Sequence, residues 1–458
     1  MIKRTYAHKY HLDLLFFALL GAVTYFIPQV AFVVGIFAFV YGMFRTLKTR
    51  NRYGEAHLYA AFIVGAEVYF RMNYTPLPWE FAKLSVVILL MTGWFVEKRR
   101  KPFAFIYLLY LVLLIPGVLV PEWESLEAFK KEFMFTFFGE IVLVLSVFYF
   151  YRREMNHIEI VRLLRWMLLG IFLTSILLFL KTPNYTTIEY GTSVSFDASG
   201  GFGPNQVAAI LGLGITILGY ALLIGKTLFY RKIVDISMLM LFTLQGLFTF
   251  SRGGLMSAIL SLLLGIIVLY LYNGHQAKRL LKISPLRIFV LIGLMFASYS
   301  IVDNITNGAL DKRYLNVDEY GKQIKEDYST KRIAIAEEDW HTFLRFPFTG
   351  AGVGGGRIFR ERSTDISATH VEQTRILAEH GVLGIFVLMI MFFYPIWIFF
   401  KVRNALTRFT LTVFAAYAVL TMTHNALRLA MPSFLYGVAF IRLRVDKETE
   451  KRHTVKVG

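Results

Sequence analysis

The sequence has no cysteine, and only 17% of its 458 residues are charged. Without cysteine, neither disulfide bonds nor thiolate chemistry is available to the chain. A soluble domain usually carries about 25% charged residues, so the chain is short of the charge that would cover a water-facing surface. The hydrophobic content is correspondingly high, at 56%. These shortages argue against a soluble globular protein.

Apolar residues are grouped in blocks of roughly 15 to 22, the length at which a helix spans the hydrocarbon core of a bilayer. The blocks alternate with short polar loops, which argues for one membrane domain over residues 1–458. We therefore expect an all-α polytopic membrane helix bundle with about 12–14 transmembrane helices, residues 1–202 forming an N-terminal helical half. The blocks are residues 12–27, 30–44, 57–70, 81–96, 103–120, 133–151, 162–180, 204–224, 234–250, 253–272, 286–302, 374–400, 409–422 and 432–441.

The formal net charge of +18 follows from loops that alternate along the chain. Eight segments hold 31 of the 49 basic residues: 3–9, 45–52, 98–101, 152–165, 226–232, 278–287, 401–408 and the tail from 442. Cytoplasmic loops carry such an excess. If the N-terminus is inside, every basic loop lies in the cytoplasm, and residues 401–458 form C-terminal helices and a basic cytoplasmic tail. The charge thus reports topology, and nucleic acid is not an expected partner.

One outer loop is much longer than the others, at residues 303–372, and long loops are usually functional. Within it, residues 329–344 are predicted to form an amphipathic helix, whose apolar stripe would lie on the membrane surface or against the outer ends of the spans. Residues 350–356 are expected to be flexible because five of the seven are glycine. Thr369 and Glu372 match a capping box, which predicts that the next helix begins at Thr369.

Three residues on the predicted outer face are candidates for chemistry. Arg252 lies in a tight turn between two spans, where its guanidinium can bind phosphate oxygens or reach lipid headgroups. Arg332 lies on the loop helix, where a solvated surface position is the plainer interpretation. His370 would occupy the first turn of a helix, where the helix dipole favours a neutral imidazole that can act as a base. A surface histidine without a role is the alternative.

Other polar residues give weaker signals. Glu67, Lys83 and Glu140 lie in or beside spans, which leaves open a transport path. His424, Asn425 and Arg428 form a late cluster that is as easily structural as functional. Adjacent carboxylates at residues 337–339 diverge around a helix, so no metal site is expected there.

Four motifs occur in a fixed order. They are residues 203–208 (Gly-Pro-Asn-Gln-Val-Ala), residues 251–253 (Ser-Arg-Gly), Arg332 followed by Trp340 and the Pro-x-x-Gly-x-Gly run at 347–352, and His370 eleven residues before Gly381. Together they resemble the O-antigen ligase and O-antigen polymerase superfamily of bacterial membrane glycosyltransferases. The resemblance covers about residues 202–390. It identifies residues 203–400 as a ligase- or polymerase-like catalytic region that includes the long periplasmic loop.

The resemblance implies catalytic roles for His370, Arg252 and Arg332, with both arginines binding the diphosphate of an undecaprenyl-diphosphate-linked glycan. Asn205, Ser251, Trp340 and Glu372 are candidate supporting residues. An acceptor hydroxyl would attack the anomeric carbon with inversion, His370 would take the proton, and no metal or other cofactor is implied. Ligase patterns often have a leucine four residues after the first arginine and a polar residue after the histidine. Met256 and Val371 stand there, which leaves ligase and polymerase unresolved.

The expected location is the bacterial inner membrane, with a multi-pass topology and the active site facing the periplasm. O-antigen ligation onto lipid A–core is the leading hypothesis, and membrane lipids are the surrounding partners. The alternatives are polymerisation of O-antigen or exopolysaccharide repeat units, and glycan transfer to serine or threonine of exported proteins. A flippase or transporter of lipid-linked glycans, without covalent chemistry, is a rival from another class.

Overall fold

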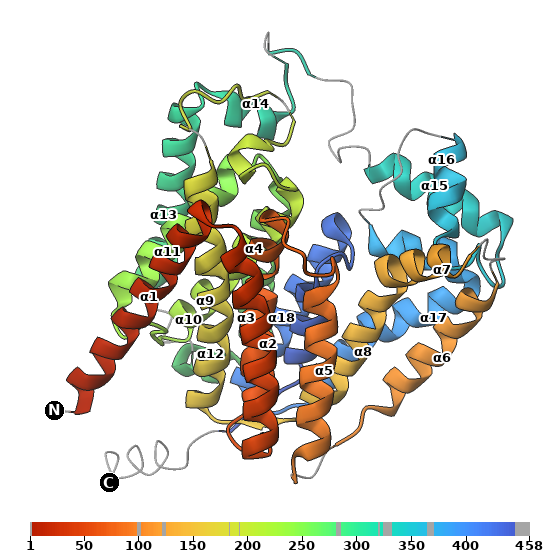
Figure 1. Cartoon of the computed structure of the whole chain (residues 1–458), viewed down its shortest axis with the longest axis horizontal. Helices are drawn as coiled ribbons and strands as arrows, with labels where there is room; N and C mark the ends of the chain where they lie inside the picture. Colours follow the sequence, from red (N-terminus) through yellow and green to blue (C-terminus); the bar gives the residue numbers. More distant parts are fainter. Residues whose placement is uncertain are drawn as a thin grey trace.

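The computed structural model describes residues 2–98, 102–120, 125–182, 184–191, 193–280, 285–318, 321–323, 332–363 and 371–444. These residues form a helix bundle with almost no strand (Figure 1). The first half contains α1 (Ile2–Phe26), α2 (Gln29–Thr49), α3 (Glu55–Gly65), α4 (Glu67–Met72), α5 (Phe81–Val96), α6 (Phe105–Leu119), α7 (Leu126–Glu132), the π-helix η1 (Phe133–Phe137), α8 (Phe138–Phe150), β1 (Glu154–Met155), α9 (His157–Lys181) and the short 3₁₀ helix η2 (Asp197–Ser199). The second half contains α10 (Pro204–Leu223), α11 (Lys232–Phe248), α12 (Arg252–Leu280), α13 (Pro285–Ile305), α14 (Ala309–Leu315), α15 (Arg332–Arg345), α16 (Gly355–Ser363), α17 (Glu372–Lys401), α18 (Ala405–Asn425), α19 (Ala430–Val438) and β2 (Arg442–Leu443).

The all-α prediction is confirmed, and every predicted apolar block falls on a helix or on consecutive helices. Within the described ranges, eight helices are long and apolar enough to cross a membrane: Gln29–Thr49, Leu126–Phe150, His157–Lys181, Pro204–Leu223, Arg252–Asn273, Arg287–Ile305, Glu372–Lys401 and Ala405–Asn425. Three more apolar helices, Leu12–Phe26, Phe81–Val96 and Phe105–Leu119, are shorter. The chain is thus a multi-pass helical protein, and a total of 12–14 crossings stays a prediction.

Burial separates a protein-enclosed centre from an apolar exterior. The span in α10 has 89% of its residues buried, whereas the span in α13 has 11%. Large apolar side chains are exposed on the peripheral helices, among them Phe26, Phe105 and Phe289. Soluble monomers rarely expose so much contiguous apolar surface. A lipid environment explains this surface, because hydrocarbon solvates apolar side chains without cost.

Loops from separate parts of the chain meet at one end of the bundle. Asn51, after α2, donates to the Glu97 carboxylate (3.4 Å), and Arg153, after α8, donates to both oxygens of that carboxylate (3.1 and 2.7 Å). Asn404, between α17 and α18, donates to the Leu443 carbonyl (3.2 Å) in β2, which pairs with β1 just after α8. This gathering of basic loops is the arrangement that their alternation predicts.

Helix α17 is broken at Gly381, which has φ +58° and ψ −138°. A β-carbon at Gly381 would lie 2.6 Å from the Pro347 carbonyl oxygen, so the glycine permits the close approach of the 347–350 segment. The break exposes backbone carbonyls: the N–H of Ala351 donates to Ala378 O (2.8 Å) and that of Gly352 to Glu379 O (3.0 Å). The prediction of a flexible stretch at residues 350–356 is therefore wrong, because its first residues are docked on the broken helix.

The start of α17 and the buried face of α15 differ from the predictions. The N-cap of α17 is Val371, one residue before Glu372, instead of the predicted Thr369, which itself lies outside the described residues. Helix α15 confirms the predicted loop helix over residues 332–344, but its buried face carries Ile335, Asp339 and Thr342. Ile333, Trp340 and Leu344 of the predicted apolar stripe are exposed. A position of the stripe against the outer ends of the spans is therefore wrong, and a position on the membrane surface stays a prediction. The buried face of α15 is a different one: it contains Asp339, whose carboxylate accepts from the Thr374 hydroxyl (2.7 Å).

Candidate functional site

The end of the bundle opposite the basic loops contains a cavity of about 310 Å³, here called the arginine cavity. It lies where α10 and α12 begin and α18 ends, beside α14 and the start of α15. Its lining consists of Val194, Phe196, Gly203, Pro204, Asn205, Gln206, Ser251, Arg252, Arg313, Arg332, Asn425 and Arg428. Four arginines and two candidate supporting residues thus share one space.

Arg252 and Arg332 both line this cavity although eighty positions separate them in the sequence. Arg252 is the first residue of α12, directly after the tight turn from α11. Arg332 is the first residue of the described part of α15. The structure therefore brings together the two arginines that the sequence singled out, while their role in binding stays a prediction.

Asn205 and Ser251 join the two helices that begin at the cavity. The Ser251 hydroxyl donates to the Asn205 side-chain oxygen (2.7 Å), and Pro204 occupies the first turn of α10, where its missing N–H costs nothing. A β-carbon at Gly254 would lie 2.0 Å from the Ala208 carbonyl oxygen, so only glycine allows α12 to approach α10 this closely. These contacts explain physically why a Pro-Asn pair and an Arg-Gly-Gly turn occur at these positions.

Arg313 is a cavity residue that the sequence analysis missed. It projects from α14, and its Nε donates to the Phe250 carbonyl (3.4 Å) in the turn before Arg252. Burial, together with the smaller effect of the positive charges of Arg252 and Arg332, lowers the pKa of Arg313 to about 10. Arg313 therefore still carries a proton at neutral pH, and the three guanidinium groups are close enough to repel one another.

Asn425, the last residue of α18, and Arg428, in the loop between α18 and α19, both line the cavity. One side of the loop is held by Arg71, which donates to the Arg428 carbonyl (3.0 Å) and to the Gln206 side chain (3.0 Å). Glu67 pairs with Arg71 (2.7 Å) and accepts from the Ala430 N–H (2.8 Å). Charged groups in the neighbouring helices thus fix the loop's backbone.

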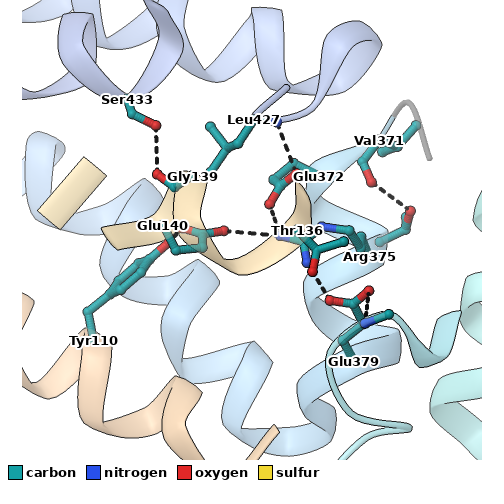
Figure 2. A network of polar contacts seen from close by, with 12 residues as sticks. Tyr110, Thr136, Gly139, Glu140, Val371, Glu372, Arg375, Glu379, Leu427 and Ser433 are labelled. Carbon is teal, nitrogen blue, oxygen red and sulfur yellow. Dashed lines mark hydrogen bonds and ion pairs between the residues drawn. The ribbon is translucent and has the colours of Figure 1, made fainter. Parts of the chain in front are cut away.

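The other side of the loop is held by Glu372, which accepts from the Leu427 N–H (3.2 Å) and forms an ion pair with Arg375 (Figure 2). Arg375 also pairs with Glu379 and lies 3.5 Å from Glu140, whose other oxygen accepts from the Tyr110 hydroxyl. All four charged groups are almost fully buried. Glu372 therefore does not line the cavity, and it contacts the backbone of the loop that supplies Arg428.

Two features of this loop indicate strain and an unmet hydrogen-bonding capacity. Ala426 has φ +49° and ψ −155°, a conformation that residues with a β-carbon rarely adopt. Asn425 is fully buried, and neither its Oδ1 nor its Nδ2 has a hydrogen-bond partner among the described residues. Because Asn425 lines the cavity, a ligand there can supply those partners.

The cavity favours an anion. No residue in the described lining carries a carboxylate, and four carry guanidinium groups. The N-termini of α10 and α12 add the positive ends of two helix dipoles. Guanidinium groups match phosphate oxygens in geometry, and a bound diphosphate would relieve the repulsion among them.

The structure does not place the remaining predicted site residues, His370 and Trp340, in the cavity lining. His370 falls outside the described residues. Trp340 is half exposed, stacks on Phe343 at 5.0 Å between ring centroids, and does not line the cavity. Lys83 pairs with Glu80 (2.8 Å), and Glu140 accepts from Tyr110 in a different cluster; the transport path stays an untested alternative.

Two questions remain about the site: whether it could hold a metal ion, and which of its residues the sequence indicates. In the part of the chain that the structure describes, no group of three or more His, Asp or Glu side chains is arranged to hold a metal ion. The sequence indicates Asn425 and Arg428, with His424, as a late cluster that is as easily structural as functional, whereas Arg313 gives no signal among the many charges of its loop. The chain matches no protein-family model and no curated protein sequence.

Proposed function

We propose that the chain is a membrane glycosyltransferase that moves a glycan from undecaprenyl diphosphate to an acceptor sugar hydroxyl, with O-antigen ligation onto lipid A–core as its leading reaction. The observation that carries the proposal is the arginine cavity, where Arg252, Arg313, Arg332 and Arg428 line one space without a described carboxylate. A diphosphate is the ligand whose charge and oxygen geometry this lining matches.

In the proposed reaction, an oxygen of the acceptor attacks the anomeric carbon of the donor sugar. The bond from that carbon to the diphosphate oxygen breaks, and undecaprenyl diphosphate leaves with the electron pair, so the configuration inverts. The hydroxyl proton passes to a base, a role that the sequence resemblance gives to His370. The arginines stabilise the negative charge that grows on the leaving diphosphate, and as preorganised groups they need little reorganisation.

The proposal places the cavity at the periplasmic face of the bacterial inner membrane. Its support is the charge asymmetry of the loops, because the basic loops gather at the opposite end of the bundle. A lipid-borne substrate also fits the position of the cavity at one end of the spans, where the diphosphate of a membrane-embedded polyprenol would lie.

The direct test uses the purified protein in lipid nanodiscs with an undecaprenyl-diphosphate-linked glycan and lipid A–core. The proposal expects a new glycosidic bond, detected by mass spectrometry, and its loss in the Arg252→Gln variant. If the folded wild-type protein moves the lipid-linked glycan across the bilayer without forming a bond, the flippase alternative is correct and the proposal is wrong.

Deletion of the gene separates the acceptors. Loss of a ligase leaves core-only lipopolysaccharide and accumulated lipid-linked polymer, whereas loss of a polymerase leaves a single repeat on the core. Unglycosylated exported proteins with normal lipopolysaccharide would instead identify a protein O-glycosyltransferase.

A further inference from the structure

A second cavity of about 500 Å³ lies at the end of the bundle opposite the arginine cavity. Helix α5 connects the two ends: it begins beside Glu80, which contacts Arg71 near the first cavity, and ends beside Glu97 at the second. The lining of this second cavity consists of Trp94, Glu97, Pro102, Phe148, Tyr149, Tyr151, Arg152, Arg153, Glu154, Arg442 and Arg444. Nothing in the proposed glycosyl transfer uses it.

The charge of the lining is unbalanced. Glu97 is paired with Arg153, with N–O distances of 3.1 and 2.7 Å, and Glu154 is paired with Arg444. Arg152 and Arg442 form no ion pair with any described carboxylate and so leave two positive charges in excess. The Nε atom of Arg152 is buried and has no hydrogen-bond partner among the described residues. A buried guanidinium donor without a partner indicates a missing acceptor.

The backbone holds these two arginines in place. Arg152 has a positive φ of 51°, and its N–H donates to the Phe440 carbonyl (2.9 Å). The N–H of Arg442 donates to the Arg153 carbonyl (2.8 Å), next to the short parallel ladder of β1 and β2. The guanidinium of Arg152 lies 5.2 Å from the centroid of the Tyr151 ring. The positions are thus set by the fold before any ligand arrives.

The surroundings indicate a ligand with an apolar part. Trp94, Pro102 and Phe148 supply apolar surface to the cavity, and Phe95 and Phe105 are exposed on the adjoining outer surface of the bundle. Tryptophan and tyrosine gather at the boundary between hydrocarbon and water, which is where phospholipid phosphates lie. Basic cavities between spans on a cytoplasmic face are suited to acidic headgroups.

We propose that this cavity binds the phosphodiester headgroup of an anionic phospholipid, with Arg152 and Arg442 contacting the phosphate and the acyl chains lying on the adjacent apolar surface. Inorganic phosphate shares the charged chemistry but lacks the acyl chains, so it distinguishes a lipid site from a site for a soluble anion.

The test compares three additives on the purified full-length protein in a zwitterionic detergent: phosphatidylglycerol, phosphatidylcholine and inorganic phosphate. Native mass spectrometry measures bound lipid, and thermal unfolding measures stabilisation. We expect phosphatidylglycerol to bind at least tenfold more tightly than phosphatidylcholine, and inorganic phosphate at millimolar concentration to give no comparable stabilisation. Each of Arg152→Gln and Arg442→Gln should weaken phosphatidylglycerol binding by about tenfold or more, the loss of one charge-assisted hydrogen bond.

The matched control is the double variant Arg50→Gln/Arg231→Gln, which removes two exposed arginines from two other basic loops, residues 45–52 and 226–232. The control variant should keep wild-type selectivity for phosphatidylglycerol. Equal binding of both lipids by the wild-type protein would overturn the proposal, as would equal losses in the control and the cavity variants. Stabilisation by inorganic phosphate equal to that by phosphatidylglycerol would overturn the assignment to a lipid. Because the wild-type comparison needs no variant, the test stands even if a variant fails to fold.

Discussion

Replacement of Arg332 by glutamine removes one positive charge from the arginine cavity while retaining a side chain of similar length. A hydrogen bond to a charged group contributes about 1.5–3 kcal/mol, so the affinity for undecaprenyl diphosphate should fall by about 10- to 150-fold. The ligand-free protein should behave in the opposite sense. Because Arg332 adds to the repulsion that lowers the pKa of Arg313, its removal should leave the melting temperature unchanged or raise it.

Binding is measured by native mass spectrometry or by ligand-induced thermal stabilisation, with undecaprenol as the comparison ligand because it has the same chain without the diphosphate. Affinity for undecaprenol should not change in the Arg332→Gln variant. The control is Arg345→Gln, the same substitution at the other end of α15, where the guanidinium lies 5.1 Å from the Phe359 ring and outside the cavity. Wild-type affinity in a folded Arg332→Gln variant, or an equal loss in Arg345→Gln, would refute the reasoning.

Three further predictions concern catalysis and the support of the loop. His370→Ala should lower the rate of single-turnover glycosyl transfer by about a hundredfold or more, the scale of a lost general base, while donor binding persists. A near-normal rate would remove His370 from the mechanism. Activity should be undiminished in EDTA, and a strict requirement for added Mg²⁺ would count against charge stabilisation by arginine. Glu372→Gln should destabilise the protein by about 3–5 kcal/mol, because it leaves the buried Arg375 guanidinium with an incomplete set of partners. The control, Glu154→Gln at the exposed ion pair with Arg444, should destabilise the protein by at most about 1 kcal/mol. Similar melting temperatures for these last two variants would show that the buried network does not hold the loop.

The helices were predictable because apolar block length is a local property of the sequence. Residues 204–224 illustrate this: the block and α10 agree almost residue for residue, since proline starts the helix and apolar side chains continue it. The broken helix α17 was not predictable, because Gly381 interrupts an otherwise continuous apolar run and its φ of +58° is set by contact with Pro347.

The site was predictable only in part. Arg252 stood out because it is a charge in a two-residue turn between apolar blocks. Arg313 gave no signal and Arg428 appeared only in a late polar cluster, because their approach to Arg252 depends on how α14 and the loop after α18 pack in three dimensions. The sequence suggested Glu372 through a capping box, but in the structure its carboxylate binds the Arg375 guanidinium and the Leu427 N–H, and the contact with Leu427 joins distant segments, which the sequence does not indicate.

The most direct test of the central claim is an experimental structure of the protein bound to undecaprenyl diphosphate. The account predicts both phosphates inside the arginine cavity, with oxygens within hydrogen-bond distance of Arg252 and Arg332 and the His370 imidazole on the same face of the bilayer. Phosphates bound elsewhere, or His370 beyond reach of the sugar attached to that diphosphate, would contradict it.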